Sequence, residues 1–259
     1  MKKLIGLFVF QLLLISAFSQ GKSLYQKRLF IRDRDTLPYR IMFPDHYKPK
    51  KKYPVVLFLH GAGERGNDNE LQLTWGWDLF ADSLHRKNFP AIVIFPQCPL
   101  NDFWAAVTIN RNVQPMGFVF LSEQPMNRPL QLVSQLMDSI HSSKGVDKKR
   151  MYIGGLSMGG MGTFDLLWRK PNFFAAAFPI CGAGDTTKPA VYGKNFPIWV
   201  FHGADDPVVD VNNSRRMVAE LKKAGANVKY SEYPGVKHDS WKNAFAEPDL
   251  LPWLFKQHK

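Results

Sequence analysis

One serine, one histidine and a small group of aspartates could carry the chemistry of this sequence. Ser157 occupies the centre of Gly155-Leu156-Ser157-Met158-Gly159, a G-x-S-x-G pattern between an apolar run and a helix-like segment. A serine in such a turn is held in strained geometry with its hydroxyl above the sheet. Side chains two positions away on either side would collide with neighbouring backbone, which explains the two outer glycines. The pattern predicts that Ser157 is a nucleophile.

A serine hydroxyl needs a base to take its proton and a third group to orient that base. His238 is nearly the only choice of base, because the other histidine after the candidate acids, His258, lies in the tail. Asp206 is preferred as the acid, since it fits an H-G-x-x-D-x-x-V pattern, and Asp205 is the alternative. The aspartate not used would be a turn or cap residue. Two histidines at strand ends are expected to brace loops instead: His60 and His202.

Attack on a carbonyl also requires N–H donors for the developing oxyanion. Met158, directly after the nucleophile, is predicted to supply one. Ala62 is predicted to supply the second, with Gly63 next, because both follow the first central strand. Glu64 and Arg65 are expected to brace this loop, although Arg65 could also meet an anionic substrate. A phosphate cradle is disfavoured because no Lys-Ser/Thr pair follows the glycines.

The segment 98–129 is too long for a simple connection, and long loops in compact domains are usually functional or mobile. Its large side chains could line a pocket or pack beneath the loop itself: Trp104, Met116, Phe118 and Phe120. Two tryptophans are predicted as substrate-binding residues, Trp104 and Trp241.

The elements that must position these residues alternate between apolar runs and helix-like segments, which predicts an α/β fold with a mainly parallel sheet flanked by helices. Two runs around residues 33–36 indicate an edge hairpin. In the clearest helix, 211–227, Met217, Val218 and Leu221 share one face and Gly225 marks the end. Only about fifteen residues separate the runs ending near 181 and starting near 197, which leaves no room there for a separate cap domain. The buried runs are 53–60, 91–97, 150–155, 174–180, 197–203 and 228–234.

Residues 1–20 have the order of a secretory signal peptide, with two lysines, an apolar run and then small residues. An uncleaved anchor is the rival interpretation, but about a dozen apolar residues fall short of the ~20 that span a bilayer. We therefore expect export, secreted or periplasmic, with residues 21–259 forming one hydrolase-type domain. No stable membrane insertion is expected after the signal is removed.

The formal charge of +12 in 259 residues is scattered over short basic groups between apolar segments. A solvated surface is therefore expected rather than a nucleic-acid groove, with an acidic polymer or anionic surface as the alternative partner. The two cysteines, Cys98 and Cys181, exclude a disulfide-built scaffold, and a bond between them is left open. No Cys/His group has metal-ligand spacing, so no metal or cofactor is predicted. The oligomeric state is not predicted.

The motifs taken together resemble the α/β-hydrolase superfamily, and within it the secreted, capless esterases related to dienelactone hydrolases, feruloyl and acetylxylan esterases and polyhydroxybutyrate depolymerases. The segments that carry the resemblance are "LHGAGERG", "PQCP", "GLSMGGMGTFDL", "FHGADDPVV" and "YPGVKHDSW". The resemblance implies a Ser157, Asp206 and His238 triad that hydrolyses carboxylic esters without a cofactor. It favours small-molecule or polymer-linked substrates such as feruloyl or acetyl esters on plant polysaccharide.

Two alternatives remain open at the level of sequence. A prolyl-oligopeptidase-like peptidase shares much of the pattern, but those enzymes usually carry a large β-propeller, and only about thirty residues lie between the leader and the first central strand. A non-catalytic carbohydrate- or surface-binding module on a hydrolase fold is disfavoured because every part of the triad is present.

Overall fold

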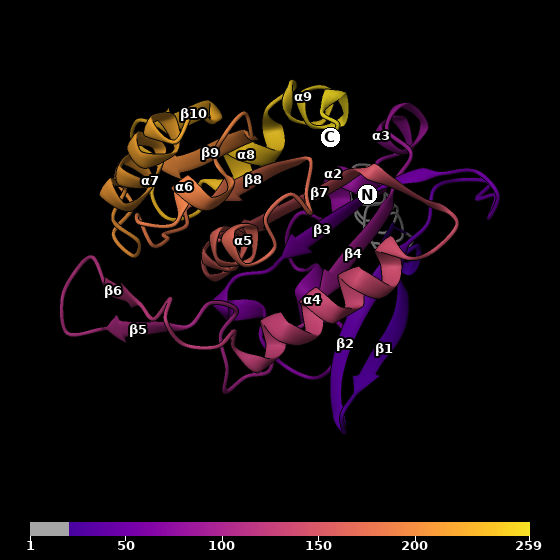
Figure 1. Cartoon of the computed structure of the whole chain (residues 1–259), viewed down its shortest axis with the longest axis horizontal. Helices are drawn as coiled ribbons and strands as arrows, with labels where there is room; N and C mark the ends of the chain where they lie inside the picture. Colours follow the sequence, from indigo (N-terminus) through magenta and orange to yellow (C-terminus); the bar gives the residue numbers. More distant parts are fainter. Residues whose placement is uncertain (1–20) are drawn as a thin grey trace, which may run out of the picture.

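An eight-stranded sheet forms the centre of the molecule in a computed structural model that describes residues 21–259 (Figure 1). The predicted signal peptide, residues 1–20, lies outside the described residues. The strands in sheet order are β1 (Gln26–Arg32), β2 (Asp35–Met42), β4 (Ile92–Pro96), β3 (Tyr53–Leu59), β7 (Val146–Leu156), β8 (Ala176–Ile180), β9 (Pro197–Gly203) and β10 (Asn227–Tyr233).

The sheet is parallel from β4 to β10, and β2 runs antiparallel to both of its neighbours. The predicted mainly parallel sheet and the predicted edge hairpin are therefore confirmed. The hairpin turns at Asp33 and Arg34, which both have positive φ, as a two-residue connection between twisted strands requires.

Helices cover both faces of the sheet (Figure 1). One face carries α4 (Arg128–His141), α5 (Met158–Arg169), α6 (Pro189–Tyr192) and α7 (Asn212–Lys223). The other carries α2 (Trp77–Ala81), α8 (Trp241–Ala246) and α9 (Leu250–Lys256). Shorter elements are α3 (Ser83–Asn88) and the 3₁₀ turns η1 (Ala62–Glu64) and η2 (Leu71–Leu73).

The side chains of the central strands contribute to two hydrophobic cores, one on each face of the sheet. In β3, Val55 and Leu57 point into the core beneath α4, α5 and α7, whereas Val56 and Phe58 point into the core beneath α2 and α9. Because successive side chains of a strand alternate between faces, a strand buried on both sides must be apolar throughout. This explains why the sequence of each central strand is a continuous apolar run.

Helix α7 confirms the expected amphipathic pattern. Met217, Val218 and Leu221 are buried against the sheet. Gly225 follows the end of the helix with φ +79°, the left-handed conformation that glycine adopts without steric cost.

The segment 98–129 contains a second, separate sheet that the sequence analysis did not predict. Strands β5 (Val107–Asn110) and β6 (Gly117–Phe120) pair antiparallel and project from one end of the molecule (Figure 1). Between β8 and β9 the chain forms only the short helix α6, as the expectation of no cap domain there requires. The hairpin β5–β6 is therefore the main addition to the sheet-and-helix body.

Two further expectations concern the cysteines and the membrane. Cys98 and Cys181 are both buried free thiols, so the bond left open by the sequence is not formed. Among residues 21–259, no helix combines the length and the apolar character needed to cross a bilayer.

Candidate active site

Ser157 lies in the turn that joins β7 to α5, with φ +53° and ψ −117°. A positive φ is unusual for any residue with a side chain and marks the strained turn expected of this motif. A Cβ at Gly159 would lie 1.9 Å from the carbonyl oxygen of Leu59, and one at Gly155 would lie 2.4 Å from the carbonyl oxygen of Gly159. The expectation that side chains would collide with backbone at these two positions is confirmed.

The first turns of α5 lie unusually close to their neighbours. A Cβ at Gly160 would come within 2.8 Å of the carbonyl oxygen of Ile180, at the end of β8. A Cβ at Gly162 would meet the Cβ of Trp104 at 2.5 Å. The glycines therefore bring the N-terminus of α5 directly behind Ser157, where the helix dipole favours negative charge.

A continuous row of hydrogen bonds joins Ser157, His238 and Asp206. His238 Nε2 lies 2.9 Å from Ser157 Oγ, and His238 Nδ1 lies 2.7 Å from Asp206 Oδ2. Asp206 follows β9 and His238 follows β10, so adjacent parallel strands deliver both side chains to the edge where β7 ends. Asp205, the alternative acid, is exposed. The arrangement can pass a proton from the hydroxyl to the imidazole.

Asp206 is held by more than the candidate base. Its Oδ1 accepts the backbone N–H groups of Val208 and Val209, at 2.8 and 3.0 Å, and its Oδ2 also accepts from His202 Nε2 at 3.1 Å. Burial alone would raise the pKa of Asp206, but the hydrogen bonds from His202 and His238 outweigh it and hold the pKa well below its usual range. Asp206 is therefore a fixed, ionised carboxylate.

His202 and His60 brace the surrounding loops, as expected from the sequence. His202 is fully buried, and its other ring nitrogen lies 2.7 Å from Ser214 Oγ. His60 Nδ1 contacts the carbonyl of Gly61 at 2.6 Å, and its Nε2 accepts the N–H of Cys98 at 3.0 Å. Burial lowers the pKa of His60 to about 4, so this imidazole is neutral and links the carboxyl ends of β3 and β4.

The two peptide groups predicted as oxyanion donors belong to separate segments that meet at one cavity. Ala62 and Met158 line the same cavity as Ser157, Ala62 at the start of η1 and Met158 at the start of α5. Arg65 Nε donates to the Ala62 carbonyl at 2.9 Å and so ties the loop in place. Two N–H groups at such positions are suited to stabilising charge on a carbonyl oxygen.

Neither tryptophan predicted to bind substrate lines the cavity at Ser157. Trp104 is fully buried, and its Nε1–H donates to the His60 carbonyl at 3.0 Å, so it braces the core beneath the site. Its neighbour Phe103 lines the cavity instead. The indole of Trp241 packs edge-on against the His238 imidazole, with ring centroids 5.5 Å apart. Trp104 therefore supports the site from within the core, whereas the partly exposed Trp241 packs against the proposed base, and its role in binding substrate stays a prediction.

The cavity has a volume of about 70 Å³ and takes its outer wall from the hairpin β5–β6. Met116 and Phe118 line it, as the sequence suggested, whereas Phe120 lines a different depression beside α5. The other hairpin residues were not predicted, because the sequence did not indicate the two strands that carry them. The cavity is also lined by Ile109, Arg111, Met161 and Val209.

Cys181 brings a thiol next to the Asp–His pair. Its Sγ, a carboxylate oxygen of Asp206 and a ring nitrogen of His238 lie within 4.8 Å of one another. These are donor types that zinc accepts. However, burial and the nearby Asp206 charge raise the pKa of the thiol, and the facing oxygen and nitrogen already share a hydrogen bond. The cluster is therefore suited to a neutral thiol packed behind the pair.

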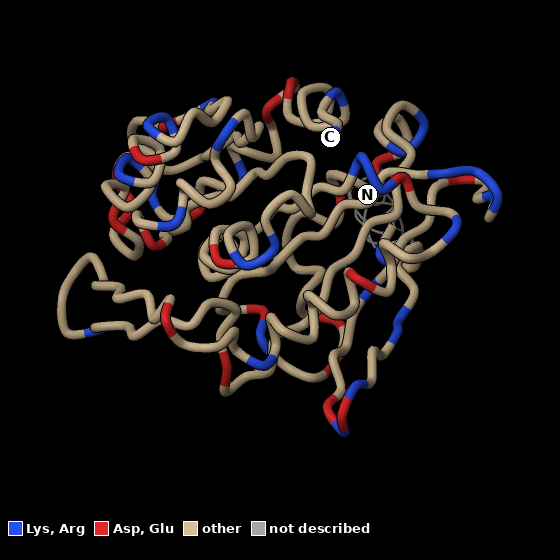
Figure 2. Tube along the Cα trace, viewed as in Figure 1, with Lys and Arg blue, Asp and Glu red and all other residues tan. Residues whose placement is uncertain are grey.

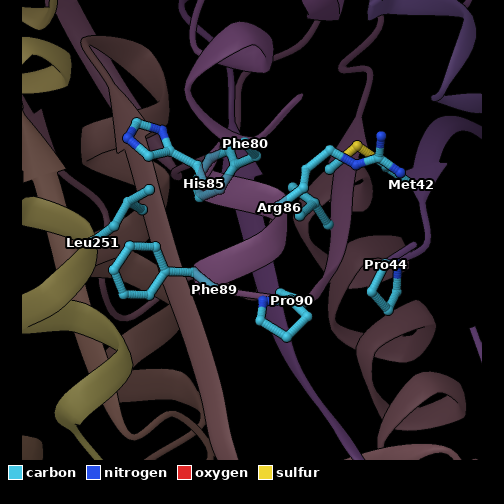
Figure 3. Close-up of a pocket in the computed structure, with 10 residues that line it drawn as sticks. Met42, Pro44, Phe80, His85, Arg86, Phe89, Pro90 and Leu251 are labelled. Atoms are coloured by element: carbon cyan, nitrogen blue, oxygen red, sulfur yellow. The ribbon is translucent and has the colours of Figure 1, made fainter. Parts of the chain in front are cut away.

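The depression in Figure 3 is distant from Ser157, His238 and Asp206. It lies beside α3 at the amino end of β4, where Phe80, Phe89 and Leu251 approach one another, and its volume is about 10 Å³. A space of that size holds about one water molecule. Ser157 lies at the carboxyl end of the same sheet, where open α/β sheets bind ligands.

Known proteins share both the sequence pattern and the fold. A sequence model of the Phospholipase/Carboxylesterase family matches residues 46–248. A bifunctional acetylxylan esterase/xylanase from Neocallimastix patriciarum is 28% identical over 164 residues, covering 61% of this chain and 20% of that enzyme. The crystal structure of a thermostable esterase matches with a TM-score of 0.81 at 35% identity, covering 93% of this chain and 64% of that one.

A ferulic acid esterase from Anaeromyces mucronatus matches with a TM-score of 0.64 at 15% identity, covering 89% of this chain and 90% of that one, and shares the fold alone. The chain thus spans a fifth of the Neocallimastix enzyme and just under two thirds of the thermostable esterase.

Proposed function

Because the chain belongs to the phospholipase/carboxylesterase family of α/β hydrolases and is a carboxylic ester hydrolase, we propose that Ser157, His238 and Asp206 are its catalytic triad. The observation that supports this most directly is the unbroken row of hydrogen bonds, 2.9 Å from serine to histidine and 2.7 Å from histidine to aspartate. In this assignment the enzyme is a serine carboxylesterase that works through an acyl-enzyme.

In the proposed reaction, Ser157 Oγ attacks the ester carbonyl while His238 Nε2 accepts the hydroxyl proton. The imidazolium then donates that proton to the leaving alcohol, and the carbon–oxygen bond breaks. A water molecule, activated by the same nitrogen, attacks the acyl-enzyme and releases the acid. Asp206 holds the imidazole in the correct tautomer and stabilises its positive charge.

The N–H groups of Ala62 and Met158 are proposed to receive the carbonyl oxygen as it becomes negative. Their support is position, since both residues line the cavity at Ser157 and the loop of Ala62 is fixed by Arg65. Donors that are already in place stabilise the transition state without reorganisation, and one such donor contributes about 10²–10³ in rate.

We further propose that the mature enzyme begins near residue 21 after export, and that its substrates are small or polymer-linked esters, including acetyl or feruloyl groups on plant polysaccharide. The similarity to an acetylxylan esterase supports the acetyl substrate. The N-terminal sequence of the protein recovered from an exporting host tests the first proposal, with a start near residue 21 expected and an intact Met1 contradicting it.

A panel of esters tests the function itself. The wild type should hydrolyse p-nitrophenyl acetate, methyl ferulate or longer acyl esters and should react with a fluorophosphonate probe. Ser157→Ala should lose about 10⁴–10⁶ of the rate and all labelling. A preference for a peptide p-nitroanilide would instead favour the peptidase alternative. A folded wild type that neither cleaves esters nor takes the probe would favour a non-catalytic binding module.

A further inference from the structure

Arg65 brings a positive charge to the cavity at Ser157, and only some of its hydrogen-bond donors have partners in the protein. Its Nε donates to the Ala62 carbonyl at 2.9 Å and its Nη1 donates to the Asp102 carbonyl at 3.3 Å. The guanidinium lies over the Phe103 ring, 4.7 Å from its centroid. A guanidinium has five N–H donors, so these two hydrogen bonds leave donors for a ligand.

No carboxylate oxygen within residues 21–259 lies within 4.0 Å of the Arg65 guanidinium. Five other arginines are also at least partly buried, and each has a carboxylate oxygen within 4.0 Å: Arg40, Arg86, Arg128, Arg150 and Arg169. Among residues 21–259, Arg65 is the partly buried arginine that forms no such ion pair. Because burying an unpaired charge is costly, this position favours an anion supplied from outside.

A second arginine faces the same cavity from the opposite wall. Arg111 follows β5 and lines the cavity; its Nη1 donates to Met116 Sδ at 3.8 Å, and no carboxylate oxygen within residues 21–259 lies within 4.0 Å of it. It is the sole Lys or Arg in the stretch 105–127, and Figure 2 shows that the projecting hairpin is mostly uncharged. The two arginines thus bring two positive charges to a cavity whose other lining residues, apart from Ser157, are apolar.

The remaining wall is mainly apolar and partly open to solvent. Phe103, Phe118 and Met161 are among the residues that line it, and the cavity measures about 70 Å³. Such a space accommodates a compact apolar group, and a longer group would extend out through its open side. An acceptable ligand therefore combines a small apolar body with a negatively charged end.

We propose that the preferred ester carries a carboxylate, bound by Arg65 and steered by Arg111, on the part of the molecule that enters this cavity. The proposal rests on the proposed function, since it concerns the substrate of the same serine. Arginine suits this role because its planar fork can bind a carboxylate through two parallel hydrogen bonds.

Matched pairs of esters test the proposal. One pair carries the charge on the acyl side, the 4-nitrophenyl monoester of succinic acid against 4-nitrophenyl butyrate. The other carries it on the alcohol side, 4-acetoxybenzoate against its methyl ester. For each pair the readout is the ratio of kcat/KM for the anionic ester to kcat/KM for the neutral one, compared between wild type and variants. Comparing ratios removes differences in intrinsic reactivity.

Arg65→Gln should lower this ratio about tenfold to a hundredfold for at least one pair, the size expected for hydrogen bonds to a charged group. Arg111→Gln, at an exposed position, should lower the same ratio about two- to fivefold. Arg28→Gln is the matched control, because it removes one positive charge from β1 at the far edge of the sheet. Raising NaCl from about 0.02 M to about 0.5 M should also lower the wild-type ratio.

If Arg65 only braces the loop of Ala62, its replacement will slow both members of a pair equally and leave the ratio unchanged, which overturns the proposal. Should Arg65→Gln fail to fold, unchanged ratios in Arg111→Gln and at high salt would overturn it equally. A wild type that cleaves neither neutral nor anionic esters would instead refute the proposed function, so the two failures are distinguishable.

Discussion

The two walls of the cavity at Ser157 are built in different ways. The inner wall consists of strand ends and the start of α5, where buried residues are fixed by hydrogen bonds and backbone segments touch at glycines. The outer wall is the hairpin β5–β6, a two-stranded sheet whose residues are partly or fully exposed. We therefore propose that the sheet fixes the catalytic residues, whereas the hairpin sets which ester fits the cavity.

The strongest test of the inner wall concerns its two adjacent aspartates. Asp206→Asn should lower kcat about 10³- to 10⁴-fold, because an amide cannot stabilise the imidazolium and can hold the wrong tautomer. Asp205→Asn is the matched control, since Asp205 is exposed, and its kcat should stay at the wild-type value. Equal effects of the two substitutions on ester hydrolysis would contradict the assignment of the acid.

The close backbone contacts predict a large difference between two glycines. Gly159→Ala should lower the free energy of unfolding by about 3 kcal/mol or more, because its Cβ would lie 1.9 Å from the Leu59 carbonyl oxygen. Gly63→Ala, with nothing within 4 Å of the added Cβ, should change it by less than about 0.5 kcal/mol. Urea denaturation measures both, and a mild effect at Gly159 would show that the inner wall can relax.

Acid should weaken the inner wall through His60. Its imidazole stays neutral in the folded chain down to a pKa of about 4, whereas the unfolded chain takes up the proton near pH 6.5. The stabilisation is therefore complete above about pH 6.5 and is lost as the pH falls towards about 4, a change of about 3 kcal/mol. The hairpin segment 105–121 contains no histidine or carboxylate that could add to this slope.

Urea unfolding at a series of pH values measures the slope in the wild type and in His60→Gln. The variant is expected to have a lower stability at neutral pH and a flatter dependence between about pH 6.5 and about pH 4. An unaltered slope in the variant would place the titration in another group.

Neighbouring residues on the hairpin give the smallest expected effects and the sharpest test of the outer wall. Phe118 lines the cavity, whereas Val119 points outward and is 63% exposed. Phe118→Ala should change kcat/KM about threefold to tenfold for acyl groups long enough to reach the hairpin, in line with the loss of one apolar contact. Val119→Ala should leave the acyl preference of the wild type unchanged. An equal change of kcat/KM in both variants would argue that the hairpin does not determine acyl specificity.

The inner wall was largely predictable from sequence because its residues follow buried strands. Once β7, β9 and β10 run parallel in one sheet, the residues after their carboxyl ends must lie along one edge, which is how Ser157 and His238 come together from distant positions. The role of His202 as a second hydrogen-bond donor to Asp206 was not predicted, because it depends on a side-chain orientation that the strand pattern does not specify.

The outer wall was predicted only in part. The length and aromatic content of segment 98–129 indicated a pocket, and Met116 and Phe118 do line the cavity. Which of Phe103 and Trp104 faces it could not be inferred, since no periodicity governs an irregular loop. That choice depends on the distant Gly162, whose missing side chain leaves room for the indole, and on the His60 carbonyl that accepts its N–H.

The two buried cysteines can report local opening of the sheet edge at which Ser157 and His238 lie. Cys98 and Cys181 follow β4 and β8, and neither sulfur can meet an alkylating reagent while the strand ends remain closed. The rate at which iodoacetamide alkylates these thiols in the native protein therefore measures how often this edge opens locally. No introduced label is needed. A bound inhibitor that holds the edge shut would slow the tagging in proportion to its occupancy.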